Sequence, residues 1–220
     1  MQTFATAAPI AAVLDVPAGR LQFIAADRTD TTVEVRPADP GKSRDVRTTE
    51  RTTVSYAEGV LRIHTAEAEN GLVGPGAVEI TVQLPAGSRV EARTAAAELR
   101  GVGRLGDVDF EGAYRRIKVD EAASLRLTAV DGDVEIGRLT GPGAISTARG
   151  DIRVAEAVRG TLTLRTESGS ITVGAAAGTS ASLDAGTAHG RVTNSLRNDG
   201  TVGLDIRATT NHGDITARSL

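Results

Sequence analysis

A short motif recurs through the second half of the chain, in which a glycine is followed by alternating polar and aliphatic residues. Its copies begin at glycines spaced 18, 19, 21 and 23 residues apart, namely Gly132, Gly150, Gly169, Gly190 and Gly213. A unit of this length is too small to bury its own apolar face, so it must stack on an equivalent unit. The sequence therefore predicts a protein built from stacked coils.

The residues after each glycine alternate as they do in a β-strand that buries one face. Val134 and Ile136 would point inward, while Glu135 between them points outward. A second alternating strand precedes the next glycine, as in Leu162-Thr163-Leu164. We therefore expect an all-β fold, a parallel β-solenoid. Because parallel crossover connections are usually right-handed, the expected form is a right-handed β-helix.

The composition fits a narrow aliphatic core. Aromatic residues make up only 2% of the chain, whereas a wide globular core normally uses some large aromatic side chains to fill space. The 25 glycines suit tight corners, because glycine accepts a positive φ at little cost. An aspartate after the glycine can accept hydrogen bonds from nearby backbone N–H groups in the turn. We expect that role for Asp107, Asp133, Asp151 and Asp214.

The first ninety residues are less regular than the rest. Strand-like runs such as Val78–Val82 are separated by turn residues, and Tyr56–Ile63 has the pattern of a hairpin. A solenoid needs covered ends, because an open coil exposes unpaired strand edges. We therefore interpret residues 1–90 as a β-rich N-terminal cap and residues 91–220 as the coils. A separate small β-sandwich is the alternative for the first segment.

Helical patterns are nearly absent. Glu91–Arg100 is the only stretch with much helix-forming composition, and its Ala-rich run is expected to be loop or strand. The charged segment Asp39–Arg51 is expected to act as a linker.

Charge, cysteine content and hydropathy exclude several classes of protein. The net charge is −3, and no block of basic residues interleaved with aromatics occurs, so we expect no nucleic-acid partner. Cysteine is absent, which rules out disulfides and thiolate metal sites. No apolar stretch approaches the length of a membrane span, and no signal peptide is recognisable. We expect a cytoplasmic protein without a membrane partner; a secreted protein whose leader has been removed is the alternative.

Four segments carry a resemblance to a known family. They are Gly19-Arg20-Leu21, Leu84-Pro85-Ala86-Gly87-Ser88, Gly103-Arg104-Leu105-Gly106 and Asn211-His212-Gly213-Asp214-Ile215-Thr216. With the Gly-Asp-Ile repeats, they make the chain similar to actinobacterial β-strand-repeat proteins grouped as candidate adhesins, a domain of unknown function. The resemblance spans nearly the whole chain and implies the same repeat fold without a catalytic motif. Arg115-Arg116 and Asn198–Gly200 depart from the repeat pattern.

No residues form a recognisable catalytic, cofactor-binding or metal-binding motif, so we expect no cofactor. Tyr114, Arg115 and Arg116 form a cluster beside Asp120 and Glu121. This cluster could bind an anionic ligand, although a solvated turn with surface ion pairs is the simpler interpretation.

His189 and His212 each stand directly before a repeat glycine. If the coils stack in register, the two imidazoles become neighbours along one edge. Two histidines could bind zinc or exchange protons, but no third ligand lies at a diagnostic spacing. An exposed corner is the alternative. His64 is expected on a strand surface, and the Gly-Asp corners are expected to form turns rather than a calcium ladder.

The functional hypothesis that fits these features best is a noncatalytic scaffold or binding protein with an elongated β face. Its outward side chains, including Lys118, Glu135, Arg153 and Thr172, would form regular rows suited to a protein or polymer partner. One alternative is an enzyme on a β-helix scaffold that acts on a small metabolite or a carbohydrate. Another is a structural protein that assembles into homo-oligomers through its coil ends.

Overall fold

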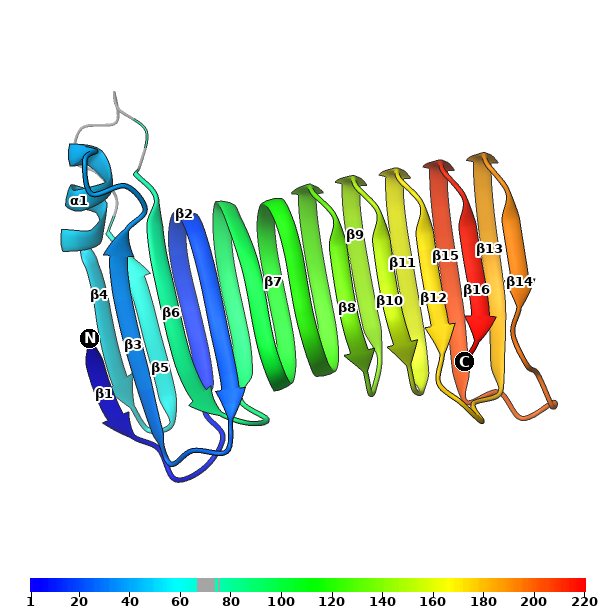
Figure 1. Ribbon diagram of the computed structural model, residues 1–220, viewed down its shortest axis with the longest axis horizontal. Helices are drawn as coiled ribbons and strands as arrows, with labels where there is room; N and C mark the ends of the chain where they lie inside the picture. Colours follow the sequence, from blue (N-terminus) through cyan, green and yellow to red (C-terminus); the bar gives the residue numbers. More distant parts are fainter. Residues whose placement is uncertain (67–73, 75) are drawn as a thin grey trace.

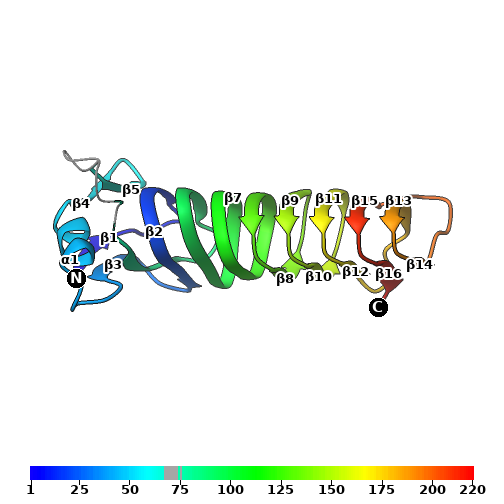
Figure 2. The ribbon, with the colours of Figure 1, turned by 90° about the horizontal axis from the view of Figure 1, so that it is seen from above.

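The computed structural model describes residues 1–66, 74 and 76–220, without the side chains of residues 113–115. These residues form an elongated, flattened tube of β-strands with a short helix near its N-terminal end (Figure 1, Figure 2). Within this part of the chain, no helix has the length and apolarity needed to cross a membrane. The elements in chain order are β1 (Gln2–Ala5), β2 (Ala11–Ala26), β3 (Asp30–Pro37), α1 (Ser43–Glu50), β4 (Thr52–Ala57), β5 (Val60–Thr65), β6 (Val78–Pro85), β7 (Arg89–Asp131), β8 (Val134–Leu139), β9 (Gly143–Arg149), β10 (Ile152–Ala157), β11 (Gly160–Ser168), β12 (Ile171–Ala175), β13 (Ala181–His189), β14 (Val192–Ser195), β15 (Leu204–His212) and β16 (Ile215–Ser219).

Each coil of the tube places one strand on each of two faces, and the core lies between them. One face contains, in spatial order, β8, β10, β12, β16 and β14, whereas the other contains β9, β11, β15 and β13. The long strand β7 winds through the preceding coils (Figure 1). Glu91–Arg100 lies within β7, which confirms strand rather than loop for that segment. The all-β, mostly parallel architecture agrees with the expected solenoid, whose handedness stays a prediction.

Aliphatic side chains form the predicted ladders inside the tube. Ile117, Val134, Ile152 and Ile171 are successive parallel partners, and each is at most 1% exposed. Complete burial of one such side chain contributes about 1.5–3 kcal/mol of hydrophobic free energy. Stacking therefore supplies the burial that no single coil could provide.

The last two coils do not stack in sequence order, an arrangement that the glycine spacing does not predict. Ile171 pairs with Ile215, and Val192 then pairs with the far side of Ile215. The strands β15 and β16 thus fill the space between the coil of β11 and β12 and the coil of β13 and β14. Figure 1 shows the red strands lying inside the orange ones.

A similar exchange occurs at the other end of the tube. β2 pairs in parallel with β7 on one side and with β5 and β6 on the other, so the first coil of the chain lies one coil inside the end. Antiparallel strands then cover the outer coil, because β3 pairs with β6, β1 with β3, and β4 with β5. The β4–β5 pair is the hairpin that the Tyr56–Ile63 pattern predicts.

The charged segment expected to be a linker instead contains the helix α1. Its sequence has little helical preference, so tertiary contacts must hold it. The Asp45 side chain is buried and accepts the N–H of Ala77 at 3.0 Å, while the Thr48 hydroxyl accepts the N–H of Gly76 at 3.0 Å. These bonds attach the helix to the chain just before β6, a relationship that local sequence does not reveal.

Candidate functional surfaces

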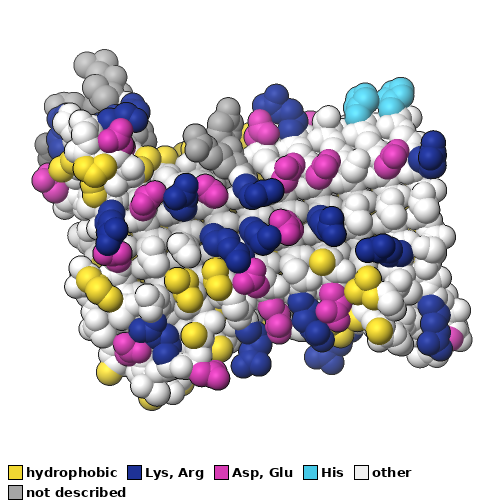
Figure 3. Space-filling model, viewed as in Figure 1, with side chains coloured by type: hydrophobic (Ala, Val, Ile, Leu, Met, Phe, Trp, Pro, Cys, Tyr) yellow, Lys and Arg dark blue, Asp and Glu magenta, His cyan; other side chains and the backbone are white. Residues whose placement is uncertain are grey.

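One row of outward side chains crosses successive coils on the face of β8, β10 and β12. Lys118, Glu135, Arg153 and Thr172 are consecutive register partners, as the sequence predicted. We call these four residues the face row. Beyond Thr172 the same row continues with Thr216. Figure 3 shows charged side chains lined up along the long axis of the tube over several coils.

The first two charges of the face row are paired with each other. Lys118 Nζ lies 2.9 Å from Glu135 Oε1, and the Lys118 ammonium holds the pKa of the Glu135 carboxyl below its ordinary value. Both side chains are about 40% exposed, so the pair contributes only about 0–1 kcal/mol to stability. The charges of this row are therefore available to a partner at little structural cost.

A better anchored pair lies two positions along the neighbouring strands. Arg100 Nη1 contacts Asp120 Oδ1 at 2.6 Å, and the other oxygen of Asp120 accepts the N–H of Gly103 at 3.2 Å. Burial alone would raise the pKa of Asp120, but these hydrogen bonds and the Arg100 charge outweigh it and lower the pKa. Asp120 therefore joins adjacent coils.

The aspartates at the glycine corners form a ladder between coils. Asp133 accepts the backbone N–H of Asp151 at 3.0 Å, Asp151 accepts that of Ser170 at 2.7 Å, and Asp214 accepts that of Arg191 at 2.8 Å. The predicted hydrogen bonds to backbone are present, but they reach the next coil rather than closing their own turn. The carboxylate at one corner can reach the backbone of the next corner because stacked corners are separated by a single strand spacing.

Asp107 does not belong to this ladder. It lies within β7 and accepts the hydroxyl of Ser124 at 2.5 Å. The sequence grouped it with the corner aspartates because it also follows a glycine, Gly106. Its place on the other edge corrects that expectation.

Sequence reasoning missed a threonine ladder on the inner side of the same corners, in which Thr166 and Thr210 are buried and Thr187 is half-buried. Thr166 donates to the carbonyl of Gly150 at 3.2 Å, and Thr210 donates to that of Gly169 at 2.9 Å. Thr187 donates in the same way to Gly213. A Thr three residues before four of the five corner glycines is the signal that could have revealed it: Thr147, Thr166, Thr187 and Thr210.

The two corner histidines are brought together as predicted. His189 and His212 are register partners on β13 and β15, and their rings stack with centroids 4.8 Å apart and planes 18° apart. Both are exposed, and Figure 3 shows two histidines side by side at one edge of the far end. Across the described residues, no group of three or more His, Asp or Glu is arranged to hold a metal ion.

The other predicted site residues are not gathered into one site. The side chains of Tyr114 and Arg115 lie outside the described residues, and Arg116 is exposed. Asp120 pairs with Arg100, as described above, and Glu121 is the register partner of Arg138. His64 is an exposed residue of β5, with Nδ1 3.6 Å from a carboxylate oxygen of Asp15, as expected for a strand surface.

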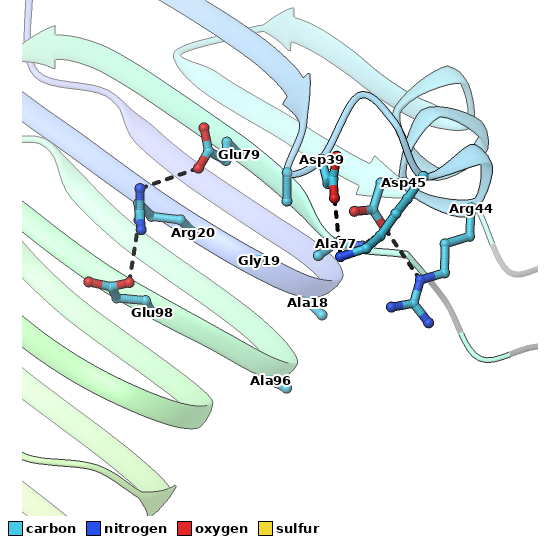
Figure 4. A pocket seen from close by; sticks show the side chains of 12 residues that line it. Ala18, Gly19, Arg20, Asp39, Arg44, Asp45, Ala77, Glu79, Ala96 and Glu98 are labelled. Carbon is cyan, nitrogen blue, oxygen red and sulfur yellow. Dashed lines mark hydrogen bonds and ion pairs between the residues drawn. The ribbon is translucent and has the colours of Figure 1, made fainter.

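An open cleft of about 530 Å³ lies where α1 and the preceding loop approach the first coils (Figure 4). Arg20 stands in it between Glu79 and Glu98, with a nitrogen 3.3 Å from each carboxylate. On the opposite wall, the N–H of Gly41 and the ammonium of Lys42 lower the pKa of Asp39. The charges that Figure 4 draws are thus engaged with one another. The cleft lies beside α1, whereas β13 and β15, which end at His189 and His212, lie at the opposite end of the tube (Figure 1).

Several solved structures are similar to this chain. One from Clostridium sporogenes ATCC 15579, described as a candidate cell adhesion protein, is 11% identical over all of this chain and 98% of its own, with a TM-score of 0.42. Candidate adhesins from Bacteroides fragilis NCTC 9343 and Parabacteroides distasonis ATCC 8503 are 12% and 13% identical over 98% of this chain and 95% of their own, with TM-scores of 0.49 and 0.44. Among curated proteins there is no match.

The family assignment comes from the sequence profile rather than from these distant structures. The profile described as Toastrack DUF4097 matches residues 12–218, which include every coil of the tube from β2 to β16. The chain therefore belongs to the Toastrack DUF4097 family.

Proposed function

We propose that this protein is a noncatalytic binding scaffold whose partner lies along the face row. The observation that carries the proposal is the register of Lys118, Glu135, Arg153 and Thr172 across four successive coils. Stacked strands are spaced about 4.7–4.9 Å apart, so the row presents side chains at a fixed repeat. A flexible loop cannot hold charges at such a spacing.

The chemistry of the row favours an extended partner. Positive and negative groups alternate from Lys118 through Glu135 to Arg153, and each is at least partly exposed. Single exposed ion pairs bind weakly. A protein strand or a polymer with repeated charged groups engages several of them at once, and the second and later contacts form at a high effective concentration. The partner class is thus a linear protein segment or a charged polymer.

The test compares two variants that remove the same charges from opposite faces. The first replaces Lys118, Glu135 and Arg153 with serine. The matched control replaces two exposed basic residues and one exposed acidic residue of the other face in the same way: Arg126, Arg165 and Glu167. Both variants change the net charge of the protein equally. A difference in their binding therefore depends on which face lost its charges and not on the electrostatic field of the whole protein.

Binding is measured with immobilised protein and defined polymers, namely heparin, polyglutamate, polylysine and an uncharged glucan. We expect a polymer that binds wild type to lose at least about tenfold in affinity on the face-row variant, and to bind the opposite-face variant normally. Equal losses on both variants, or the absence of binding to every polymer, would contradict a polymer-binding face row.

A further inference from the structure

His189 and His212 are held next to each other by the backbone of two stacked coils. The two residues are register partners on the parallel strands β13 and β15. The N–H of Gly213, which follows His212, donates to the carbonyl of His189 at 2.9 Å. Because paired strands are about 4.7–4.9 Å apart, the two side chains leave the same edge of the tube one strand spacing from each other. The fold itself therefore brings the two imidazoles together.

Hydrogen bonds on both sides of the pair keep these coils in register. Two residues before His189, the Thr187 hydroxyl donates to the carbonyl of Gly213 at 3.0 Å. Two residues after the pair, the Asp214 carboxylate accepts the N–H of Arg191 at 2.8 Å. These contacts fix the backbone around the imidazoles, so a ligand that binds both rings requires no rearrangement of the coils.

The imidazole rings are accessible and close enough to share one ligand. Both residues are exposed, and their ring centroids are 4.8 Å apart with planes 18° apart (Figure 3). Two nitrogens that bind one zinc ion at about 2.0–2.1 Å are at most about 4.2 Å apart. Rotation of the exposed rings about their side-chain bonds tilts the nearly parallel planes and brings one nitrogen of each ring within this limit.

We propose that His189 and His212 together bind one divalent cation of the late first-row metals, with Cu²⁺ bound more tightly than Ni²⁺ or Zn²⁺. The neutral imidazole is the commonest metal ligand in proteins, and it suits these three ions, among which copper binds most strongly to a given site. Mg²⁺ and Ca²⁺ prefer oxygen ligands. Across the described residues, no third His, Asp or Glu joins the pair. The remaining coordination positions are therefore open to water or to a donor group of another molecule.

The bound ion also links the terminal strand β13 to β15. In the unfolded chain the two histidines are separated by a full repeat, so the folded protein binds the ion more tightly than the unfolded chain does. A ligand that prefers the folded state stabilises it in proportion to the logarithm of the ligand concentration. The thermal midpoint of the wild type should therefore rise with the concentration of Ni²⁺ or Zn²⁺, and that of His212→Gln should not.

The first experiment measures affinity by isothermal titration calorimetry with Cu²⁺, Ni²⁺, Zn²⁺ and Mg²⁺ in a non-chelating buffer. The chain has three histidines, and His64 lies in β5 at the opposite end of the tube (Figure 1), so His64→Gln is the matched control. We expect one Ni²⁺ or Zn²⁺ per chain and no binding of Mg²⁺. His189→Gln and His212→Gln should each bind at least about tenfold more weakly, whereas His64→Gln should bind like the wild type.

The second experiment locates the ion. Zn²⁺ is diamagnetic, so its effect on the imidazole ¹⁵N signals can be followed by NMR. The signals of His189 and His212 should shift together and stop shifting at one ion per chain, while those of His64 stay in place.

Four results would overturn the proposal. Binding by His212→Gln that equals the wild type would place the ion elsewhere, and an equal loss for His64→Gln would show that the pair has no special role. One ion for every two chains would place the site between copies. The fourth result is the absence of saturable Cu²⁺ binding below about 1 mM. Circular dichroism of each variant confirms that a loss of binding is not a loss of folding.

Discussion

Ile215 lies directly beside Ile171 in a parallel pair, although 44 residues separate them and Val192 is the next residue of that pattern along the chain. The chain thus forms the terminal coil first in sequence and returns to fill the space inside it. The burial of each aliphatic side chain in this ladder therefore depends on where its coil lies in the tube and not on where the residue lies in the sequence.

Truncation of Ile215 should destabilise the protein far more than truncation of Val192. Ile215→Ala opens a cavity between two coils, and such changes cost about 2–5 kcal/mol. Val192→Ala removes a side chain that is 43% exposed, so we expect a loss below about 1 kcal/mol. Guanidinium unfolding of both variants measures the ratio. Coils stacked in sequence order would reverse it, because Val192 would then be the enclosed rung.

The threonine ladder should contribute to stability through its hydroxyls. Thr210→Val keeps the shape of the side chain but removes the donor to the carbonyl of Gly169, which lies 2.9 Å away. Loss of one partner of a buried hydrogen bond costs about 1–3 kcal/mol. Thr209→Val, its exposed neighbour on β15, is the control, with an expected change within about 0.5 kcal/mol. Equal thermal midpoints for the two variants would show that the hydroxyl of Thr210 has no such role.

Glycine should be required at the corners and not along the strands. Gly169 has φ +152°, and a Cβ added there would lie 2.1 Å from the carbonyl oxygen of Gly150. Gly169→Ala must therefore displace a stacked corner, with an expected cost of about 1–3 kcal/mol. Gly186→Ala, where a Cβ meets nothing within 4 Å, should be nearly neutral. Urea denaturation distinguishes the two, and a neutral Gly169→Ala would mean that the corners can shift freely.

The Arg100–Asp120 contact should make stability depend on pH in the acid range. The pKa of Asp120 in the folded protein lies below its model-compound value of 3.8. The ionised carboxylate therefore stabilises the fold above about pH 4, and this contribution is lost as the pH falls through the lowered pKa. Asp120→Asn should lower the thermal midpoint at pH 7 and have a smaller effect at pH 2. Glu167→Gln, an exposed carboxylate change on the other face, supplies the control. A pH-independent effect of Asp120→Asn would contradict the ionic role.

The repeat period predicted the ladders because burial repeats wherever coils stack. Val134, Ile152 and Ile171 could be aligned from spacing alone, and so could the His189–His212 pair. Spacing could not order the last coils, because the glycine intervals of 21 and 23 residues accommodate either order.

Polarity held a signal for the order of these coils. Asn194 occupies an inward position in register with the buried Ala217. An interior coil would bury its amide without a suitable partner, so the coil that contains Asn194 belongs at the end. The amide instead remains exposed and accepts the N–H of Leu196 at 3.0 Å.

The other features that the sequence did not predict depend on tertiary contacts, which leave no pattern in the local sequence. The helix α1 depends on bonds from Asp45 and Thr48 to backbone groups about thirty residues later, which outweigh its weak propensity. The corner aspartates were expected to bond within their turns, because sequence shows neighbours along the chain and not the stacked coil. The Tyr114 and Arg115 cluster stays a prediction.

At one end of the tube, β2 pairs with β5 on one side and with β7 on the other. At the other end, β15 and β16 lie between the coil of β11 and β12 and the coil of β13 and β14. A simple repeat array unzips from its ends, one unit after another, since each unit touches only its neighbours. Here the outermost coil must leave before the first or last segment of the tube can detach, and it is joined to the interior by sequence-distant pairing. We therefore expect the coils at each end of the tube to unfold together rather than one after another. Because their pairing joins residues that are distant in sequence, these coils should both form and open slowly.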